Sequence, residues 1–175
     1  MRSRVQAFLF SVLASCALAL SLAPQVSYAK PADDQARATF LLLLSKYVTW
    51  PAGAFASPAS PVVVAVVGNP SLAKQLETLA RGQLVGGRGF EIRNAANTAD
   101  CAGAHIVFVA SSEDARALAS ASPLRVSERP DRIADTDIAI RMQEGRVAFA
   151  VNRDDVQRRG LKLSSKLLRL ASSLE

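Results

Sequence analysis

The feature that most restricts the fold is the apolar run VVVAVVG at 62–68, followed directly by Asn69 and Pro70. The run has no polar alternation, which is typical of a strand buried on both faces of a parallel sheet. Asn69 is a favourable helix N-cap, and Pro70 suits the first helical position, where its missing N–H costs nothing. The segment therefore predicts a strand–turn–helix unit, with Gly82 placed to end the helix.

A first helix is expected to begin at Asp33 or Asp34 and to end near Val48. Its apolar residues have the i, i+3, i+4, i+7 spacing of one helix face: Phe40, Leu43, Leu44 and Tyr47. Trp50 precedes a proline, and such a residue is pushed out of the helical region. The segment Pro51–Pro61, rich in Pro, Gly and Ser, is then predicted to be a loop.

Strand and helix patterns alternate through the middle of the chain. Strands are expected at 90–94, 105–110 and 124–127, with a helix capped by Ser111 or Ser112 after the second of them. Alternation of this kind favours an α/β layer fold with a largely parallel sheet.

The C-terminal part has a different pattern. Apolar residues alternate on both sides of Gln143-Glu144-Gly145, which predicts a β-hairpin. A last helix is expected to be capped by Ser164. The predicted class is thus α/β: a single-layer, mostly parallel sheet with flanking helices, closed by an antiparallel C-terminal β-hairpin.

The N-terminal residues 1–29 are predicted to be a secretory signal peptide, followed by one α/β domain at 30–175. Two early arginines precede the apolar run 5–23, and the small-x-small end Ser27-Tyr28-Ala29 follows. A membrane anchor is the alternative, because the run is near the spanning length of about 20 residues. A lipoprotein attached through Cys16 is a further alternative. In either case the remaining chain is expected to leave the cytoplasm.

The composition argues against an enzyme and against a metal site or cofactor. The chain has one His and two Cys, which removes most metal and acid–base chemistry. Cys101 and His105 are four residues apart, but a nucleophile needs an activating base with its own orienting partner. His105 is interpreted as a strand-edge residue. Cys101 is either a buried thiol or the site of an intermolecular disulfide.

Two segments are candidates for binding. Gly68, Asn69 and Pro70 lie where a strand ends and a helix begins, a place that can receive an anion; the alternative is a well-capped turn. The segment 153–169 holds six basic residues against two acidic ones. It is either a solvated face or a contact for an anionic surface, meaning an acidic protein or phospholipid headgroups. Nucleic acid is not expected as a partner of an exported chain with this few aromatics.

Four blocks resemble the YfiR family: ARATFLLLLSKYVTWP (36–51), PVVVAVVGNPSLAKQLETLA (61–80), HIVFVASSE (105–113) and GRVAFAVNRDDVQRRGLKLSSKLLRLA (145–171). The resemblance implies a small, non-catalytic protein that is exported to the periplasm. Its best-known relative represses an inner-membrane diguanylate cyclase by binding that enzyme's periplasmic sensor region. A membrane signalling enzyme or sensor is therefore the expected partner. The residues expected to bind it are Tyr47, Trp50, Arg158, Arg159, Lys162 and Lys166.

The chain departs from the family pattern in its thiols. Ala104 stands where members often have a Cys, and no Cys follows Cys101. Redox control could then operate only through a homodimer cross-linked at Cys101. A second functional hypothesis is a periplasmic small-molecule or anion receptor that uses the Gly68–Pro70 loop and signals to a histidine kinase or an uptake system.

Overall fold

The computed structural model describes residues 29–110, 118, 124–128 and 130–171. The predicted signal peptide, with Cys16 inside it, lies outside these residues except for Ala29. The helix predicted after Ser111 or Ser112 lies outside them as well.

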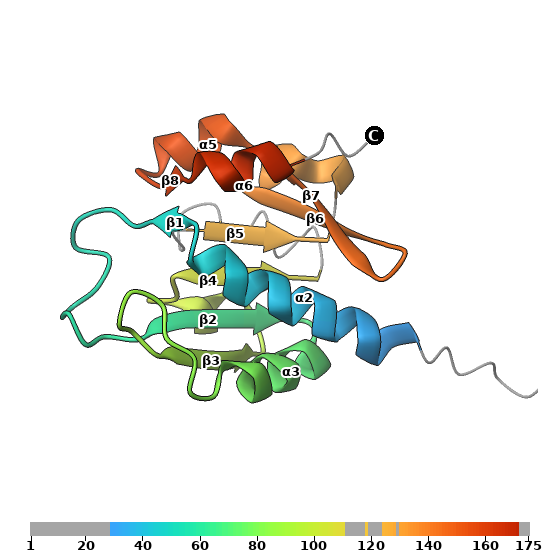
Figure 1. The fold of residues 1–175 in the computed structure, drawn as a ribbon, viewed down its shortest axis with the longest axis horizontal. Helices are drawn as coiled ribbons and strands as arrows, with labels where there is room; N and C mark the ends of the chain where they lie inside the picture. Colours follow the sequence, from blue (N-terminus) through green and yellow to red (C-terminus); the bar gives the residue numbers. More distant parts are fainter. Residues whose placement is uncertain (1–28, 111–117, 119–123, 129, 172–175) are drawn as a thin grey trace, which may run out of the picture.

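The centre of the molecule is a six-stranded sheet in the order β3-β2-β4-β5-β6-β7 (Figure 1). Its strands are β2 (Val62–Val67), β3 (Phe90–Ala95), β4 (Ile106–Val109), β5 (Leu124–Ser127), β6 (Ile138–Gln143) and β7 (Arg146–Val151). The first five are parallel to their neighbours, and β7 is antiparallel to β6. The prediction of an α/β fold closed by a C-terminal hairpin is confirmed.

Every residue of β2 is buried, and the strand contributes to two apolar clusters. Its even-numbered residues belong to the cluster that includes α2 (Ala29–Ser45) and α3 (Pro70–Ala80). Its odd-numbered residues belong to a second cluster with Cys101 and Leu118. Because successive side chains of a strand point to opposite faces, burial on both sides explains why the run has no polar alternation.

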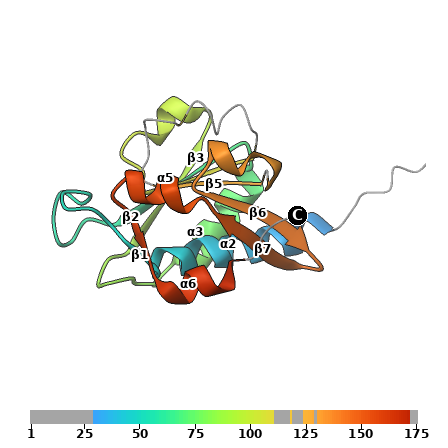
Figure 2. The same cartoon turned by 90° about the horizontal axis from the view of Figure 1, so that it is seen from above.

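Several short elements complete the fold. They are η2 (Thr98–Cys101), η3 (Pro130–Asp135), α5 (Arg153–Arg158) and α6 (Ser165–Leu170). Viewed from above, α2 and α6 lie on one side of the sheet and η2 lies on the other (Figure 2). None of the helices in the described residues is long and apolar enough to cross a membrane.

The first helix ends earlier than predicted. The N–H groups of Lys46 and Tyr47 bond to carbonyls three residues back, over 3.0 and 2.9 Å, which tightens the last turn and ends α2 at Ser45. The predicted end near Val48 was therefore wrong. Val48 instead begins the strand β1 (Val48–Thr49).

A second, two-stranded sheet joins segments that are far apart in the chain. β1 pairs antiparallel with β8 (Lys162–Leu163), and Thr49 lies opposite Lys162. Next to this pair, the Ser164 N–H donates to the Tyr47 carbonyl over 2.9 Å. The sequence patterns did not predict this sheet, which connects the end of α2 to the start of α6.

Candidate functional site

The two-stranded sheet brings three of the predicted partner-binding residues together. We call the segments 46–49 and 162–166 the β1–β8 platform. The ammonium group of Lys166 lies 5.9 Å from the centre of the Tyr47 ring, within the range of a cation–π contact. Lys162 lies opposite Thr49 and is exposed. The aromatic and basic residues that the sequence suggested thus share one surface.

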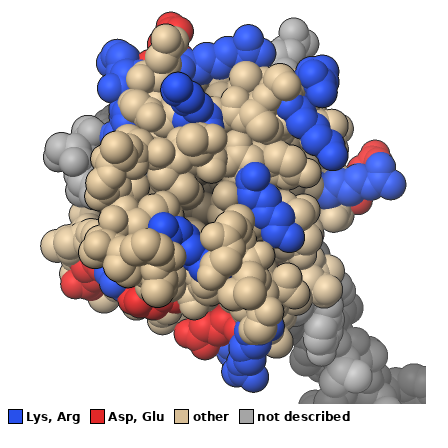
Figure 3. All heavy atoms as spheres, turned by 60° about the vertical axis from the view of Figure 1, so that its left-hand side comes forward, with Lys and Arg blue, Asp and Glu red and all other residues tan. Residues whose placement is uncertain are grey.

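The platform is basic. Lys46, Lys162 and Lys166 are exposed, as is Arg169 just beyond it, and neither 45–51 nor 160–171 contains an acidic residue. Figure 3 shows this side of the molecule, with Lys and Arg side chains spread over it and Asp and Glu side chains mainly at its margin. A surface of this composition attracts an anionic partner.

Trp50 belongs to an aromatic cluster beside the platform. Its ring lies 5.6 Å from that of His105 and 6.2 Å from that of Phe55, both edge-on. Phe55 stacks on His105 with centroids 4.3 Å apart. Trp50 is half-buried, so part of it packs and part of it remains open to a partner.

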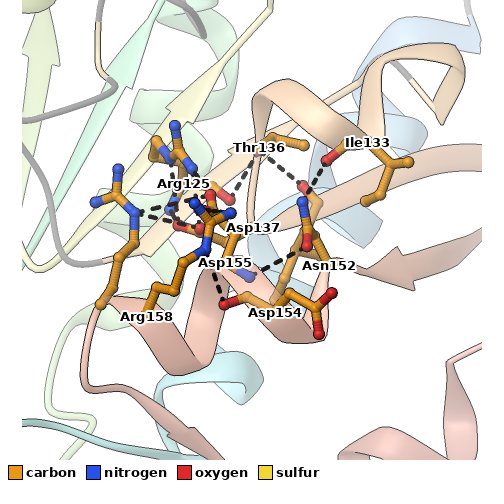
Figure 4. Close-up of polar contacts among 10 residues, drawn as sticks. Arg125, Ile133, Thr136, Asp137, Asn152, Asp154, Asp155 and Arg158 are labelled. Atoms are coloured by element: carbon orange, nitrogen blue, oxygen red, sulfur yellow. Dashed lines mark hydrogen bonds and ion pairs between the residues drawn. The ribbon is translucent and has the colours of Figure 1, made fainter.

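Arg158 and Arg159 lie on and just after α5, next to a buried ion-pair network rather than on the platform (Figure 4). The Arg158 guanidinium is 2.9 Å from the Asp155 carboxylate, yet its side chain is 73% exposed. Arg159 is largely buried and lies 3.4 Å from Asp137. Of these two residues, Arg158 is the accessible one, and Arg159 mainly neutralises internal carboxylates.

Arg125 and Asp137 form the centre of that network. Asp137 accepts hydrogen bonds from the Arg125 backbone N–H at 2.6 Å and from its Nη2 at 3.1 Å. Arg125 also pairs with Asp155 of α5. Burial raises the pKa of Asp137 above its ordinary value, and the hydrogen bonds from Arg125 oppose that rise. The network attaches α5, and through it β8, to the sheet.

Gly68, Asn69 and Pro70 lie at the other end of the sheet, where β2 ends. Strand β2 pairs with β3 on one side and with β4 on the other, so the chain reverses its winding direction there. Open α/β sheets bind ligands at this kind of switch point. Gly68 has φ +78°, and a Cβ on it would lie 3.4 Å from that of Ala110. The conformation strongly favours glycine.

Asn69 belongs to a cluster of buried and half-buried polar side chains. Its side chain caps α3 by accepting the Leu72 N–H at 3.1 Å, and its Nδ2 donates to Asp34 Oδ1 over 3.1 Å. Asp34 also pairs with Arg37, and Arg37 pairs with Glu128 just after β5. Among the residues that the structure describes, Asp34 Oδ2 and Ser127 Oγ, both buried, have no hydrogen-bond partner. The switch point therefore holds more polar and charged side chains than the capping of a simple turn requires.

Cys101 is fully buried in the second apolar cluster. Its thiol lies 3.7 Å from the Asn97 carbonyl. This position favours the buried-thiol interpretation over an intermolecular disulfide, which needs an accessible sulfur. In the described residues, no group of three or more His, Cys, Asp or Glu side chains could hold a metal ion.

The sequence patterns did not predict the buried contacts of several polar residues. Arg125 stands inside the strand motif LRVS, and Asp137 directly precedes an apolar strand. A charged residue inside an otherwise buried strand is a signal of an internal ion pair, because such residues are almost never buried unpaired. Asp34 was assigned only to the start of a helix, although it is fully buried.

The structure defines a small α/β domain with the flavodoxin-like strand order, an added antiparallel strand and a basic platform. The chain belongs to the YfiR/HmsC-like family, whose pattern matches residues 34–172. The predicted family is thereby confirmed, and membership fits a regulatory protein rather than an enzyme. The comparison with curated proteins found no match.

Proposed function

We propose that this protein is a periplasmic, non-enzymatic regulator that represses cyclic-di-GMP synthesis. It would bind the periplasmic sensor region of an inner-membrane diguanylate cyclase. Repression requires that it bind one conformational state of the cyclase more tightly than the other, since a ligand with equal affinity for both shifts nothing.

The observation that supports this proposal is the β1–β8 platform. Tyr47, Lys162 and Lys166 come from two distant segments, and strand pairing together with the Ser164–Tyr47 hydrogen bond holds them side by side. Aromatic side chains beside a polar, solvent-accessible rim are typical of protein interfaces. The absence of acidic residues in both segments favours an acidic surface on the partner.

The direct test is capture of the partner from solubilised inner membranes, with the tagged protein as bait and mass spectrometry as the readout. Enrichment of a membrane protein with a diguanylate cyclase domain would support the proposal. Recovery of the bait alone, under conditions that keep complexes intact, would contradict it. A deletion strain with unchanged cyclic-di-GMP would contradict the repressor role separately.

We expect the double substitution Lys162→Glu and Lys166→Glu to weaken partner binding at least about tenfold, mainly through slower association. Both side chains are exposed, so the fold should be unaffected. Binding of the captured cyclase's periplasmic region, measured by biolayer interferometry at two salt concentrations, checks this. The matched control is Lys74→Glu with Arg81→Glu, two exposed cations on and just after α3. An equal loss of partner affinity in both double variants would show that the net charge of the protein matters and not the position of Lys162 and Lys166.

The switch point supports a second candidate function, a small-molecule or anion receptor. Asp34 Oδ2 and Ser127 Oγ are buried, with no hydrogen-bond partner in the part of the chain that the structure describes. Gly68–Pro70 lies where ligands bind in related architectures. A ligand at a hundredfold excess over its Kd should stabilise the protein by about 2.7 kcal/mol, a shift in Tm of about 5–10 °C. Thermal unfolding against a panel of metabolites tests this, and no saturable shift would count against the receptor.

A further inference from the structure

His105 uses both ring nitrogens to hold distant backbone groups. Its Nδ1 accepts the Val63 N–H at 3.0 Å, and its Nε2 lies 2.9 Å from the Ala54 carbonyl. Because Nδ1 is the acceptor, the proton of the neutral ring is on Nε2, where it donates to Ala54. The ring is buried just before β4. The interpretation of His105 as a simple strand-edge residue therefore misses its main contacts.

The segment held by this ring is the loop 51–61, which connects β1 to β2. Phe55 from the loop stacks on the imidazole at 4.3 Å. Arg88 holds the same loop from the other side: its guanidinium lies 3.9 Å from the Phe55 ring centre and donates to the Ser57 and Ser60 carbonyls, each over 2.8 Å. The position of the loop thus depends on the imidazole of His105 and the guanidinium of Arg88.

A second proton on His105 would disrupt this arrangement. Protonated imidazole is a donor at both nitrogens, so Nδ1–H would face the Val63 N–H instead of accepting from it. The Val63 amide would lose its side-chain acceptor, and the positive ring would lie near Arg88. The Nε2–H donor to Ala54 would remain, so both costs are relieved only if the ring leaves its buried site for water. That movement breaks the contact with Ala54 and opens the loop.

We propose that His105 is a proton-controlled latch: in its neutral form it holds the loop 51–61 closed over the amino ends of β2 and β4, and in its protonated form it releases the loop. The device responds to the pH of the compartment that surrounds the protein. Trp50 lies between β1 and this loop, so release would also alter the edge of the β1–β8 platform; that further consequence rests on the proposed function.

The charges around His105 favour the neutral ring. Burial lowers the pKa of His105, and Arg88 of the 86–89 turn and Arg93 of β3 lower it further. The hydrogen bond to Ala54 and the charge of Glu91 oppose this lowering. The loop 51–61 has no titratable side chain.

The pH dependence follows from that direction. An open loop exposes His105, whose pKa then returns to about 6.5, while the closed form keeps a lower value. As the pH falls below about 6.5, the open form takes up the proton first, so the ratio of open to closed forms rises. The rise is at most about tenfold per pH unit, and it levels off below the pKa of the closed form.

The chain has one Trp and one His, so the emission of Trp50 reports directly on this site. We expect the fluorescence of the purified protein to shift to longer wavelength in one reversible step below about pH 6.5, with far-UV circular dichroism unchanged. In His105→Asn, which keeps an acceptor near the Val63 N–H but cannot titrate, the step should vanish. Asp137 also has a raised pKa, and persistence of the step in His105→Asn would assign it to such a group and overturn the latch.

A second variant keeps the test decisive if His105→Asn does not fold. Arg88→Gln removes a cation that lowers the pKa of His105, and it also removes hydrogen bonds that hold the loop. The step should therefore move to higher pH. Lys74→Gln, on the exposed side of α3, should leave its midpoint unchanged. No step in the wild-type protein, or a midpoint unaffected by Arg88→Gln, would overturn the proposal whether or not a cyclase partner exists.

Discussion

Replacement of Arg125 by methionine should lower the free energy of unfolding by about 3–5 kcal/mol near neutral pH. Asp137 is fully buried and receives its closest hydrogen bonds from Arg125. The backbone N–H and Arg159, 3.4 Å from Asp137, would remain, but the closest guanidinium would be lost. A buried carboxylate that loses its closest cation is strongly destabilising. The measurement is denaturant unfolding followed by circular dichroism.

The loss of stability in Arg125→Met should depend on pH, and its direction follows from the raised pKa of Asp137. As the pH falls, the folded protein takes up this proton before the unfolded chain does, so the group favours folding increasingly as it becomes neutral. Without Arg125 the pKa should rise further, and the deficit of the variant should shrink in acid. A deficit that stays constant from neutral pH down to about pH 4, the ordinary pKa of an aspartate, would contradict this account.

Arg158→Met is the matched control for this substitution. Its guanidinium pairs with Asp155, but the side chain is 73% exposed, and exposed ion pairs contribute about 0–1 kcal/mol. If Arg125→Met and Arg158→Met had similar effects, burial would not be what makes the network important.

Asn69→Asp should lower the free energy of unfolding by about 2–4 kcal/mol, although aspartate is as good an N-cap as asparagine. The carboxylate could still accept the Leu72 N–H, but it cannot donate to Asp34 and would place a second negative charge beside that buried group. Because the two carboxylates would share one environment, the loss should decrease at low pH.

The control for this prediction is Asn97→Asp. Asn97 caps η2 by accepting two backbone N–H groups and is exposed, so its replacement should change the stability by about 0.5 kcal/mol or less. Thermal and urea unfolding of both variants separates the capping role of Asn69 from its amide donation. If Asn69→Asp hardly changed the free energy of unfolding, the contact with Asp34 would contribute little to stability.

The sequence alone was sufficient for the α/β class, the family and most strands. The run 62–68 predicts two-sided burial because a strand with no polar residue has no face to offer to water, and Asn69-Pro70 predicts the start of α3. These patterns are local: each depends on side-chain periodicity or on a cap within a few residues.

Tertiary structure alone decided which of the suggested residues meet. Tyr47 and Lys166 come together through the pairing of β1 with β8, whereas Arg159 turns to Asp137 and away from the platform. His105 lies at the edge of a strand, as its neighbours in the sequence indicate, but its ring also contacts Val63 and Ala54. The periodicity of a chain records which side chains are buried, but two-residue strands and ion pairs between distant segments leave no period in it. Their partners are selected only when the sheet has brought those segments within hydrogen-bond distance.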